Sequence, residues 1–395
     1  MQPGAWVACG VVLALVGCGT PSGSGPGPLA PGGAGGHEVT PSPFALTGVA
    51  DGFPFLTDIQ PVPAQPSILA VSTNGGVLSW VSLADGSRAD VLQIPEIDDP
   101  REGILGFAFH PKFPADRRVF VHYMVGSPNG DVSRISSFDV SAGTPLGTAA
   151  DEKILVELEW PLPDHDGGAL AFGPDGMLYA AFGDGGHGLT PTSKSQDPLD
   201  LWGKMVRLDV DRTSGALPYA IPSDNPFAGR AGIRHEIFAL GFRNPWRFSF
   251  TPDGTLVVAD VGADAWEELN LARGGENFGW NVMEGDACYP PGSTCPTAGM
   301  TKPHFKYAHG KGACIVGGHV YQGARLPALR GLYVFADYER GTVWALDLAG
   351  AGPPRVVGES GRHLVAIARD SAGELYFGDI VSGEILRLDG VDPAP

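Results

Sequence analysis

The sequence predicts an all-β protein, and within that class a six-bladed β-propeller. Its 395 residues include 58 glycines and 36 prolines, a content of turn-forming residues that favours many short strands over long helices. Long segments with helical periodicity are few, whereas one short pattern of strands and turns recurs six times. Because one large all-β domain can reach this length, a second domain is not required.

The recurring unit consists of an apolar strand, a turn with Asp-Gly or a related pair, a second strand with a Leu-Tyr or Val-Phe pair, and a third apolar strand. Its turns, such as Pro174-Asp175-Gly176, reverse the chain because glycine tolerates positive φ. The copies lie at residues 68–83, 103–140, 168–209, 248–258, 331–347 and 373–389.

A small antiparallel sheet of this kind cannot bury both of its faces alone. Packing six such units around an axis buries the faces, and closing the ring protects the sheet edges. A β-sandwich would show shorter, evenly spaced strands without this repeated motif. Propellers gather their functional loops at one end of the central channel, so the long segments between strands are the places to search for a site.

The formal net charge of −18 limits the classes of partner. An acidic surface repels phosphate backbones, which argues against nucleic acid as a partner. The same charge suits divalent cations, although solubility alone explains it equally well.

Residues 1–18 are predicted to form a lipoprotein-type export signal. The segment 5–16 is mostly apolar but too short to span a bilayer, and it ends in Leu15-Val16-Gly17-Cys18, which resembles the bacterial lipoprotein signal with Cys18 as the lipid-bearing residue. The chain is then expected to be exported, to the periplasm or cell surface, and held at the membrane by its lipid alone. The basic residues that usually open an export signal are missing, and the alternative is a short hydrophobic N-terminus without a role.

The remaining organisation follows from composition. Residues 19–36 are almost only Gly, Pro, Ser and Ala, which predicts a flexible tether over residues 19–40 and a propeller over residues 41–395. Export implies an oxidising compartment, where disulfides persist. Cys288 and Cys295 enclose a short Pro/Gly loop and are the predicted disulfide pair. A zinc site is not expected, because there is no Cys-x-x-Cys spacing.

Two loop segments place a histidine and an acid around the third unit. His165 lies in Asp164-His165-Asp166-Gly167-Gly168, directly before a predicted strand, and Asp184 follows the middle strand of the same unit. Neighbouring carboxylates would hold an imidazole in one tautomer and raise its basicity, which favours a general base. The alternative is a solvated surface histidine.

A second group of candidates precedes and follows the fourth unit. Arg243 and Asn244 stand before a strand, where a guanidinium fits a carboxylate or quinone oxygen; the alternative is an ion pair between blades. The segment 260–268 follows with several acids among glycines, a pattern that suits Ca²⁺ but also suits plain solvation.

Taken together, these segments resemble the soluble glucose/sorbosone dehydrogenase family, six-bladed propellers that use pyrroloquinoline quinone and Ca²⁺. The resemblance runs from about Phe55 to Leu388, and the region of Met283 and Cys288 looks closest to the branch that includes the hedgehog-interacting proteins. The motifs that carry it lie at residues 103–111, 165–168, 196–197, 203–209, 243–245, 274–280 and 317–321.

The resemblance implies a role for each site residue. His165 matches the general base that takes the proton of an aldose's anomeric hydroxyl while hydride passes to the quinone, and Asp184 matches the acid that orients it. Arg243 matches the arginine beside the quinone oxygens, where it stabilises developing negative charge, and Asn244 matches a neighbouring cofactor contact. Electrons then pass to an external acceptor.

The resemblance also implies two calcium positions. Gly262 and Ala263 would offer backbone carbonyls to the cofactor's Ca²⁺. Glu268 and the carbonyl of Phe278 would belong to a second, structural Ca²⁺.

The chain departs from the family pattern where cations hold the tricarboxylate cofactor. Glu339 stands in place of a lysine, and Leu364 in place of a second arginine near Arg362. Arg101 replaces a glutamine, so that Arg101, Arg340 and Arg362 are the remaining predicted cofactor contacts.

A fourth departure lies beside the histidine, where Asp166 replaces the usual asparagine. His165, Asp184 and Arg243 favour a sugar dehydrogenase, whereas Glu339 and Leu364 favour a non-catalytic propeller that binds a glycan or a protein through its channel face. A Ca²⁺-dependent reaction of another kind, such as lactone hydrolysis, is the third alternative.

Overall fold

The computed structural model describes residues 44–94, 97, 103–127, 130–140, 152–160, 164–186, 194–350 and 352–390. The predicted signal and tether, Cys18 within them, and the predicted cofactor contact Arg101 lie outside the described residues. No helix in the described part is long and apolar enough to cross a membrane.

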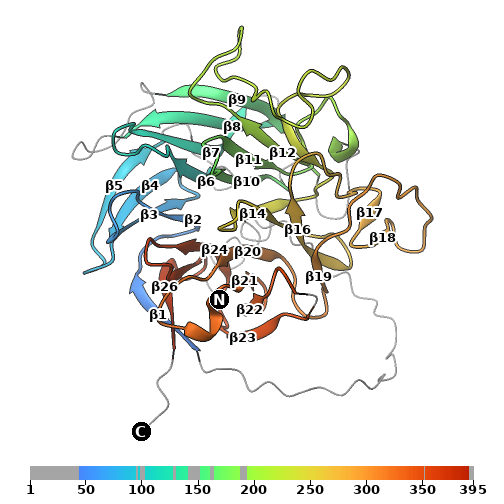
Figure 1. Cartoon of the computed structure of the whole chain (residues 1–395). Helices are drawn as coiled ribbons and strands as arrows, with labels where there is room; N and C mark the ends of the chain where they lie inside the picture. The colour runs from blue at the N-terminus through green and yellow to red at the C-terminus, as the bar shows by residue number, and fades with distance from the viewer. Residues whose placement is uncertain are drawn as a thin grey trace, which may run out of the picture.

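Six four-stranded antiparallel sheets are arranged as the blades of a ring (Figure 1), as the sequence predicted. Blade one consists of β2 (Leu56–Pro61), β3 (Ile68–Thr73), β4 (Val77–Ser82) and β5 (Arg88–Gln93). Blade two consists of β6 (Gly103–Phe109), β7 (Arg118–Ser127), β8 (Gly130–Asp139) and β9 (Lys153–Trp160). Blade three consists of β10 (Gly167–Phe172), β11 (Leu178–Phe182), β12 (Lys204–Leu208) and β13 (Ile237–Leu240).

The second half of the chain repeats the pattern with one insertion. Blade four consists of β14 (Pro245–Phe250), β15 (Leu256–Asp260), β16 (Trp266–Ala272) and β19 (Phe305–Ala308). Blade five consists of β20 (Ile315–Val320), β21 (Tyr333–Asp337), β22 (Thr342–Leu346) and β23 (Arg355–Glu359). The hairpin of β17 (Met283–Glu284) and β18 (Ala287–Cys288) lies between β16 and β19, and a disulfide joins Cys288 to Cys295, the pair expected from the sequence.

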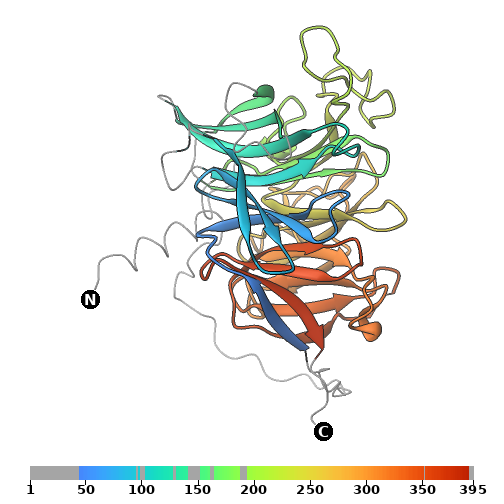
Figure 2. The same cartoon turned by 90° about the vertical axis from the view of Figure 1, so that its left-hand side faces the viewer.

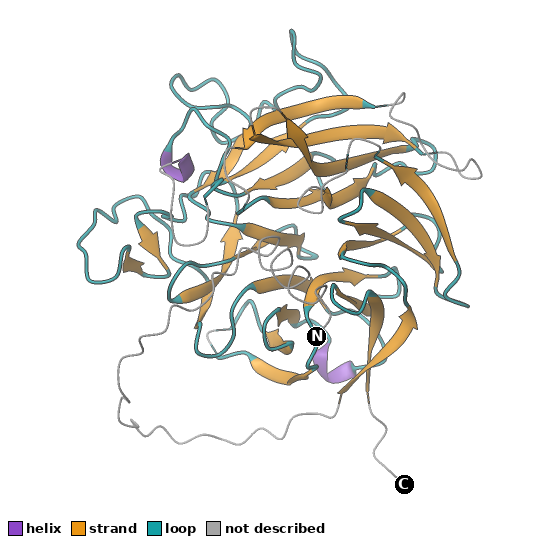
Figure 3. Ribbon diagram, turned by 180° about the vertical axis from the view of Figure 1, so that it is seen from behind, coloured by secondary structure: helices purple, strands orange, loops and turns teal. Residues whose placement is uncertain are grey.

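Blade six closes the ring with strands from both ends of the described chain. It consists of β24 (Leu364–Arg369), β25 (Leu375–Asp379), β26 (Glu384–Gly390) and β1 (Phe44–Ala50). Strand β1 pairs antiparallel with β26, from Phe44 opposite Gly390 to Ala50 opposite Ile385, and the two strands lie side by side in Figure 2. Helical structure in the described part is limited to the 3-10 turns η2 (Lys194–Gln196) and η3 (Pro327–Leu329), which stand out against the strands in Figure 3.

The first strand of each blade lines the central channel, and these six strands contact one another around the ring. We infer that these six strands run in the same direction, since residues at similar positions along neighbouring strands lie in contact with each other. Arg247, third in β14, donates to the carbonyls of Thr57 in β2 (2.5 Å) and Leu105 in β6 (2.9 Å). The loops that precede these strands therefore gather at one mouth of the channel, called here the site mouth, and the strands end at the far mouth.

Arg247 occupies the interior of the channel and links opposite sides of the ring. Its side chain reaches from blade four to blades one and two, stacks over the Trp246 ring at 4.3 Å, and lies 3.8 Å from a carboxylate oxygen of Asp58. Trp246, also fully buried, donates its indole N–H to the carbonyl of Val365 in blade six. These contacts connect blade four to blades one, two and six across the channel.

Candidate active site

The structure brings His165, Asp184 and Arg243 together at the site mouth. His165 precedes β10, Asp184 follows β11, and Arg243 precedes β14, as their sequence positions predicted. The backbone N–H of Asp184 donates to the carbonyl of Arg243 at 2.8 Å, which fixes the two loops relative to each other. All three residues are buried.

His165 and Asp184 form a hydrogen-bonded pair. Nδ1 of His165 lies 2.6 Å from Oδ1 of Asp184, which also accepts the N–H of Gly186 at 2.8 Å. The other oxygen, Oδ2, accepts the indole N–H of Trp280 at 2.7 Å. Because an ionised carboxylate only accepts hydrogen bonds, Nδ1 carries the proton and Nε2 carries the lone pair.

Nε2 of His165 is buried and has no hydrogen-bond partner among the described residues. A buried polar atom without a partner costs stability, so it marks a place where a ligand group is expected. A lone pair held ready in this way has the chemistry of a general base.

The backbone holds the histidine in an unusual conformation. His165 has φ of +55°, a region that few residues other than glycine adopt. Its carbonyl packs against Gly183, where a Cβ would lie 1.6 Å from the carbonyl oxygen. Gly183 is therefore required for the close approach that seats His165 beside Asp184.

Charge and hydrogen bonds keep Asp184 ionised. Burial alone would raise the pKa of Asp184, but the hydrogen bonds from His165 and Trp280, together with the charge of Arg243, hold this pKa below its usual value. Asp184 therefore remains an acceptor at neutral pH and orients the imidazole.

Arg243 is held at the same site by Trp280 and by the loop after β15. Its guanidinium lies 5.7 Å from the centre of the Trp280 ring, and Nη1 donates to the carbonyl of Val261 at 3.1 Å. Its backbone N–H and that of Asn244 donate to the carboxylate of Asp260, with the Asn244 bond at 2.7 Å. The side chain of Asn244 accepts the N–H of Gly167 at 2.9 Å, which ties the arginine loop to the histidine loop.

Two buried carboxylates face each other behind Arg243. Asp260 and Glu268 are register partners on β15 and β16, and burial raises the pKa of both groups, further increased by their proximity to neighbouring acids. Beside them, Oδ1 of Asn270 is buried and accepts no hydrogen bond within the described part of the chain. Carboxylate and amide oxygens gathered in this way are a donor set that suits Ca²⁺.

The other predicted calcium contacts lie in loops at the same blade. The N–H groups of Gly262 and Ala263 point to carboxylates, to Glu267 at 3.4 Å and to Glu284 at 2.9 Å. Phe278 packs its ring against Phe242 with centroids 5.0 Å apart, and its N–H donates to the carbonyl of Leu240. A direct contact between Phe278 and Glu268 is not among those formed by the described residues.

The predicted cofactor cations differ in how they are held. Arg340 is exposed and donates to the carbonyl of Gly310 at 3.0 Å. Arg362 is engaged within blade six, where its guanidinium pairs with Asp379 at 3.4 Å and with Glu384. Arg362 precedes β24, in a loop at the site mouth, but there two carboxylates of its own blade already pair with its guanidinium.

Asp166 stands where the family pattern has an asparagine, and this replacement changes the chemistry of the position little. Asp166 is buried, and burial, followed by the charges of Asp164 and Asp131, raises its pKa well above the usual value. A protonated carboxyl has a donor and an acceptor, as an amide does. Asp166 can thus replace the asparagine of the family pattern without adding a charge.

A second imidazole near the site was not found from the sequence. Nε2 of His309 lies 2.8 Å from Oε1 of Glu267. Burial lowers the pKa of His309, but the hydrogen bond and charge of Glu267 outweigh burial and raise it. His309 stands in a loop and Glu267 in a strand, so only the fold brings them together; Trp280, which contacts both Asp184 and Arg243, was missed for the same reason.

Asp337 is the basis of a pH prediction. Burial raises its pKa to about 7, against hydrogen bonds from the Arg340 N–H and the Tyr307 hydroxyl that lower it. In the unfolded chain this carboxyl loses its proton near the ordinary pKa of an aspartate, about 4. The free energy of unfolding should therefore fall as pH rises from about 4 to about 7, by up to about 1.4 kcal/mol per pH unit.

We expect Asp337→Asn to remove that dependence, since the amide keeps an acceptor and has no charge. Urea unfolding at pH 5, 6, 7 and 8 measures it: the variant should gain stability relative to the unsubstituted chain as pH rises. A constant difference across this range would contradict the raised pKa.

A cleft opens on the same face, next to the loop that carries His165, although His165 does not line it. It has a volume of about 400 Å³ and is lined by Trp160, Trp202, Asp131 and Lys194, among others. The indole of Trp160 donates to the carbonyl of Asp164, next to His165, and the Trp202 ring lies where a Cβ on Gly185 would meet it at 3.0 Å. Aromatic rings with polar groups beside them suit a hydroxylated ring.

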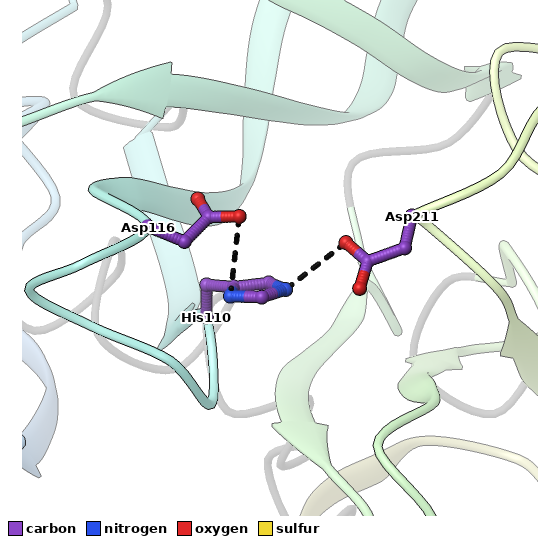
Figure 4. Close-up of side chains that lie close together, drawn as sticks. All are labelled: His110, Asp116 and Asp211. Carbon is purple, nitrogen blue, oxygen red and sulfur yellow. Dashed lines mark hydrogen bonds and ion pairs between the residues drawn. The ribbon is translucent and has the colours of Figure 1, made fainter.

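Another histidine with two acids lies at the far mouth (Figure 4). Nδ1 of His110 lies 3.3 Å from Asp116, and Nε2 lies 3.1 Å from Asp211 on the next blade. Their spacing would suit a metal ion. Arg118 donates to both acids, however, and lowers the pKa of Asp116 to about 2, so a cation is already present. We interpret this group as an ion-pair network between blades two and three.

A comparison with models of known protein families identifies the family of the chain. The model of the glucose/sorbosone dehydrogenase family matches residues 57–387, which is almost the whole ring. The chain belongs to the glucose/sorbosone dehydrogenase family. Membership accounts for the propeller and for the order of the motifs, as the sequence predicted.

Relatives of this family member include proteins of several kinds. HIPL1 protein of Arabidopsis thaliana is 31% identical over 378 residues, covering 78% of this chain and 54% of that protein. Quinoprotein glucose dehydrogenase B of Acinetobacter calcoaceticus is 31% identical over 233 residues, covering 53% of this chain and 47% of that protein. The chain thus spans about half the length of these curated relatives.

Solved structures share the fold of this family member. The pyrroloquinoline quinone-bound aldose sugar dehydrogenase of Streptomyces coelicolor has a TM-score of 0.71 at 23% sequence identity and covers 88% of this chain and 99% of its own. At this level of identity the likeness shows the fold alone.

Proposed function

We propose that this family member oxidises an aldose sugar at its anomeric carbon with pyrroloquinoline quinone and Ca²⁺. The observation that carries the proposal is the buried Nε2 of His165, which has no partner among the described residues while Asp184 holds the opposite ring nitrogen. Arg243 stands beside this pair, and the cleft of Trp160 and Trp202 adjoins it.

The residues present would form part of a binding site for the cofactor. Arg243 and Asn244 would hold the quinone oxygens, Gly262 and Ala263 would offer carbonyls to its Ca²⁺, and Glu268 with Asn270 would hold a structural Ca²⁺. When bound, the quinone supplies the acceptor for a hydride from the sugar. Of the two predicted cations that the structure describes, Arg340 is the one without a carboxylate partner, because Arg362 is already paired.

Side chains of the protein itself accept the proton of the anomeric hydroxyl. His165 Nε2 takes the proton of the anomeric hydroxyl as the hydride leaves the same carbon, so that the sugar is released as a lactone. Asp184 keeps Nδ1 protonated and stabilises the imidazolium that forms. Arg243 stabilises negative charge that develops beside it.

Reconstitution tests the proposal. The purified chain, mixed with pyrroloquinoline quinone and Ca²⁺, should reduce an artificial electron acceptor when an aldose is added. Chelation of Ca²⁺ should abolish the reduction, and added Ca²⁺ should restore it. Absence of a bound-cofactor spectrum and of reduction across a panel of aldoses would refute the proposal.

A second candidate function is a non-catalytic propeller that binds a glycan or a protein through the site mouth. Two observations favour it: Arg362 is paired with two carboxylates of its own blade, and Glu339 is an exposed carboxylate at the position where the family pattern has a lysine. Sugar binding without quinone binding, measured by calorimetry, would select this function.

We also propose that the chain is exported and lipid-anchored through Cys18. The support is the motif before Cys18 and the Gly/Pro/Ser-rich segment after it. Mass spectrometry of the processed protein should show an acylated Cys18 as the first residue. An unmodified N-terminus at Met1 would contradict the anchor.

A further inference from the structure

A pocket of about 200 Å³ lies at the far mouth of the channel, on the opposite side of Arg247 from His165. Residues of β2, β10, β14, β20 and β24 line it, and none of His165, Asp184 and Arg243 is among them, so it is separate from the candidate active site. The residues that define its chemistry are Asp58, Phe172, Arg247, Phe250, His319 and Arg369.

Arg369 contributes a positive charge that no carboxylate balances among the described residues. It is the last residue of β24, is half-buried, and makes one hydrogen bond, from Nη1 to the carbonyl of Val320 at 3.1 Å. Burial lowers its pKa, and no acid opposes that effect. A guanidinium has five N–H donors, so most of those on Arg369 remain available to a ligand.

The second arginine of the pocket is different. Arg247 is bonded to three backbone carbonyls and lies 3.8 Å from Asp58, which offsets its charge. Asp58 in turn accepts N–H groups from Ile59 and Phe107. The pocket therefore carries an excess of one positive charge, in a chain whose formal net charge is −18.

His319 adds a hydrogen-bond acceptor. Its Nε2 donates to the carbonyl of Ile367 at 3.0 Å, and this bond leaves the lone pair on Nδ1. Burial and the neighbouring Arg369 charge lower its pKa to about 3, so the ring is neutral at physiological pH. Nδ1 accepts no hydrogen bond from the described residues.

We propose that this pocket binds a small hydroxy-carboxylate. The guanidinium of Arg369 takes the carboxylate through paired N–H···O bonds, and Nδ1 of His319 accepts the ligand's hydroxyl proton. The rings of Phe172 and Phe250 flank the carbon skeleton.

Charge selects the class of anion. One uncompensated arginine balances a single negative charge, and the carboxylate of Asp58 in the same pocket repels a second one. A planar carboxylate also matches the fork of the guanidinium better than a tetrahedral dianion does in a space of this size. A monocarboxylate is therefore favoured over phosphate.

Titration calorimetry on the full chain, without quinone, tests the proposal with four probes. L-lactate should bind, propionate should bind several-fold more weakly because it lacks the hydroxyl, and lactamide should not bind because it lacks the charge. Inorganic phosphate should bind more weakly than lactate. Because no cofactor or turnover is involved, the result is independent of the proposed dehydrogenase.

Variants assign the binding to the pocket. Arg369→Met should weaken lactate binding at least about tenfold, and His319→Phe should remove the preference for lactate over propionate. Arg355→Met is the matched control, because Arg355 lies on the outer strand β23 and donates to Ala328; its lactate affinity should be unchanged.

Thermal unfolding provides a second measurement. Lactate should raise the unfolding temperature of the unsubstituted chain but not of Arg369→Met. Without lactate, Arg369→Met should unfold at the same or a higher temperature, because a half-buried charge has been removed. Lactate binding that survives in Arg369→Met, equal binding of lactamide, or no lactate binding up to about 10 mM would each overturn the proposal.

Discussion

Replacing His165 by alanine is expected to lower the rate of aldose oxidation about 10²–10⁴-fold in the reconstituted protein. Nε2 of the imidazole has no hydrogen-bond partner among the described residues, and Asp184 fixes the tautomer that leaves a lone pair on it. The loss should fall mainly on kcat, because the histidine acts on a proton that moves during the reaction.

The matched control is His235→Ala. His235 lies in the connection between β12 and β13, away from the site mouth, where its ring contacts the carbonyl of Arg230. Its rate should match that of the unsubstituted chain. Cofactor binding, followed by absorbance, should persist in both variants. An unchanged kcat in His165→Ala would remove His165 from the role of base.

Arg247→Met should have the largest effect on stability, about 3–5 kcal/mol of the free energy of unfolding. Methionine fills a similar length but leaves the carbonyls of Thr57 and Leu105 without their donor and Asp58 without its counter-charge. The channel should thus lose the link between blade four and blades one and two.

Urea unfolding measures this loss, with Arg355→Met as the control for removal of an arginine. Burial already raises the pKa of Asp58 and Arg247 lowers it, so the variant's deficit should grow with pH. Adding Asp58→Asn should recover part of the deficit, because it removes the buried carboxylate. A deficit below about 1 kcal/mol would show that the carbonyl contacts of Arg247 contribute little.

The sequence was sufficient for the fold because each blade repeats the same local signal. The Pro-Asp-Gly turn at residues 174–176 and the strand after it can be recognised without any long-range contact. It also predicted where His165, Asp184 and Arg243 stand relative to their strands. That these loops converge follows from the shared direction of the channel-lining strands.

The rest of the site depends on contacts between distant segments. Trp280 reaches Asp184 across 96 positions in the chain, and Asp260 meets Glu268 only through strand register. Arg362 is a further example: its position suggests a cofactor contact, and the fold brings two carboxylates to it, Asp379 from the end of β25 and Glu384 from the start of β26. Local sequence does not reveal which acid will satisfy an arginine.

The pairing of β1 with β26 determines how the molecule responds to tension. A pull applied to the chain ahead of Phe44 would act first on the outermost strand of blade six, at the end where Phe44 meets Gly390. Loaded from that end, the hydrogen bonds between the two strands would break one after another, beginning with the pair Phe44 and Gly390, while the other five blades keep their strand pairing. The pairing of β1 with β26, which completes the ring, is therefore also the contact that should break first under tension.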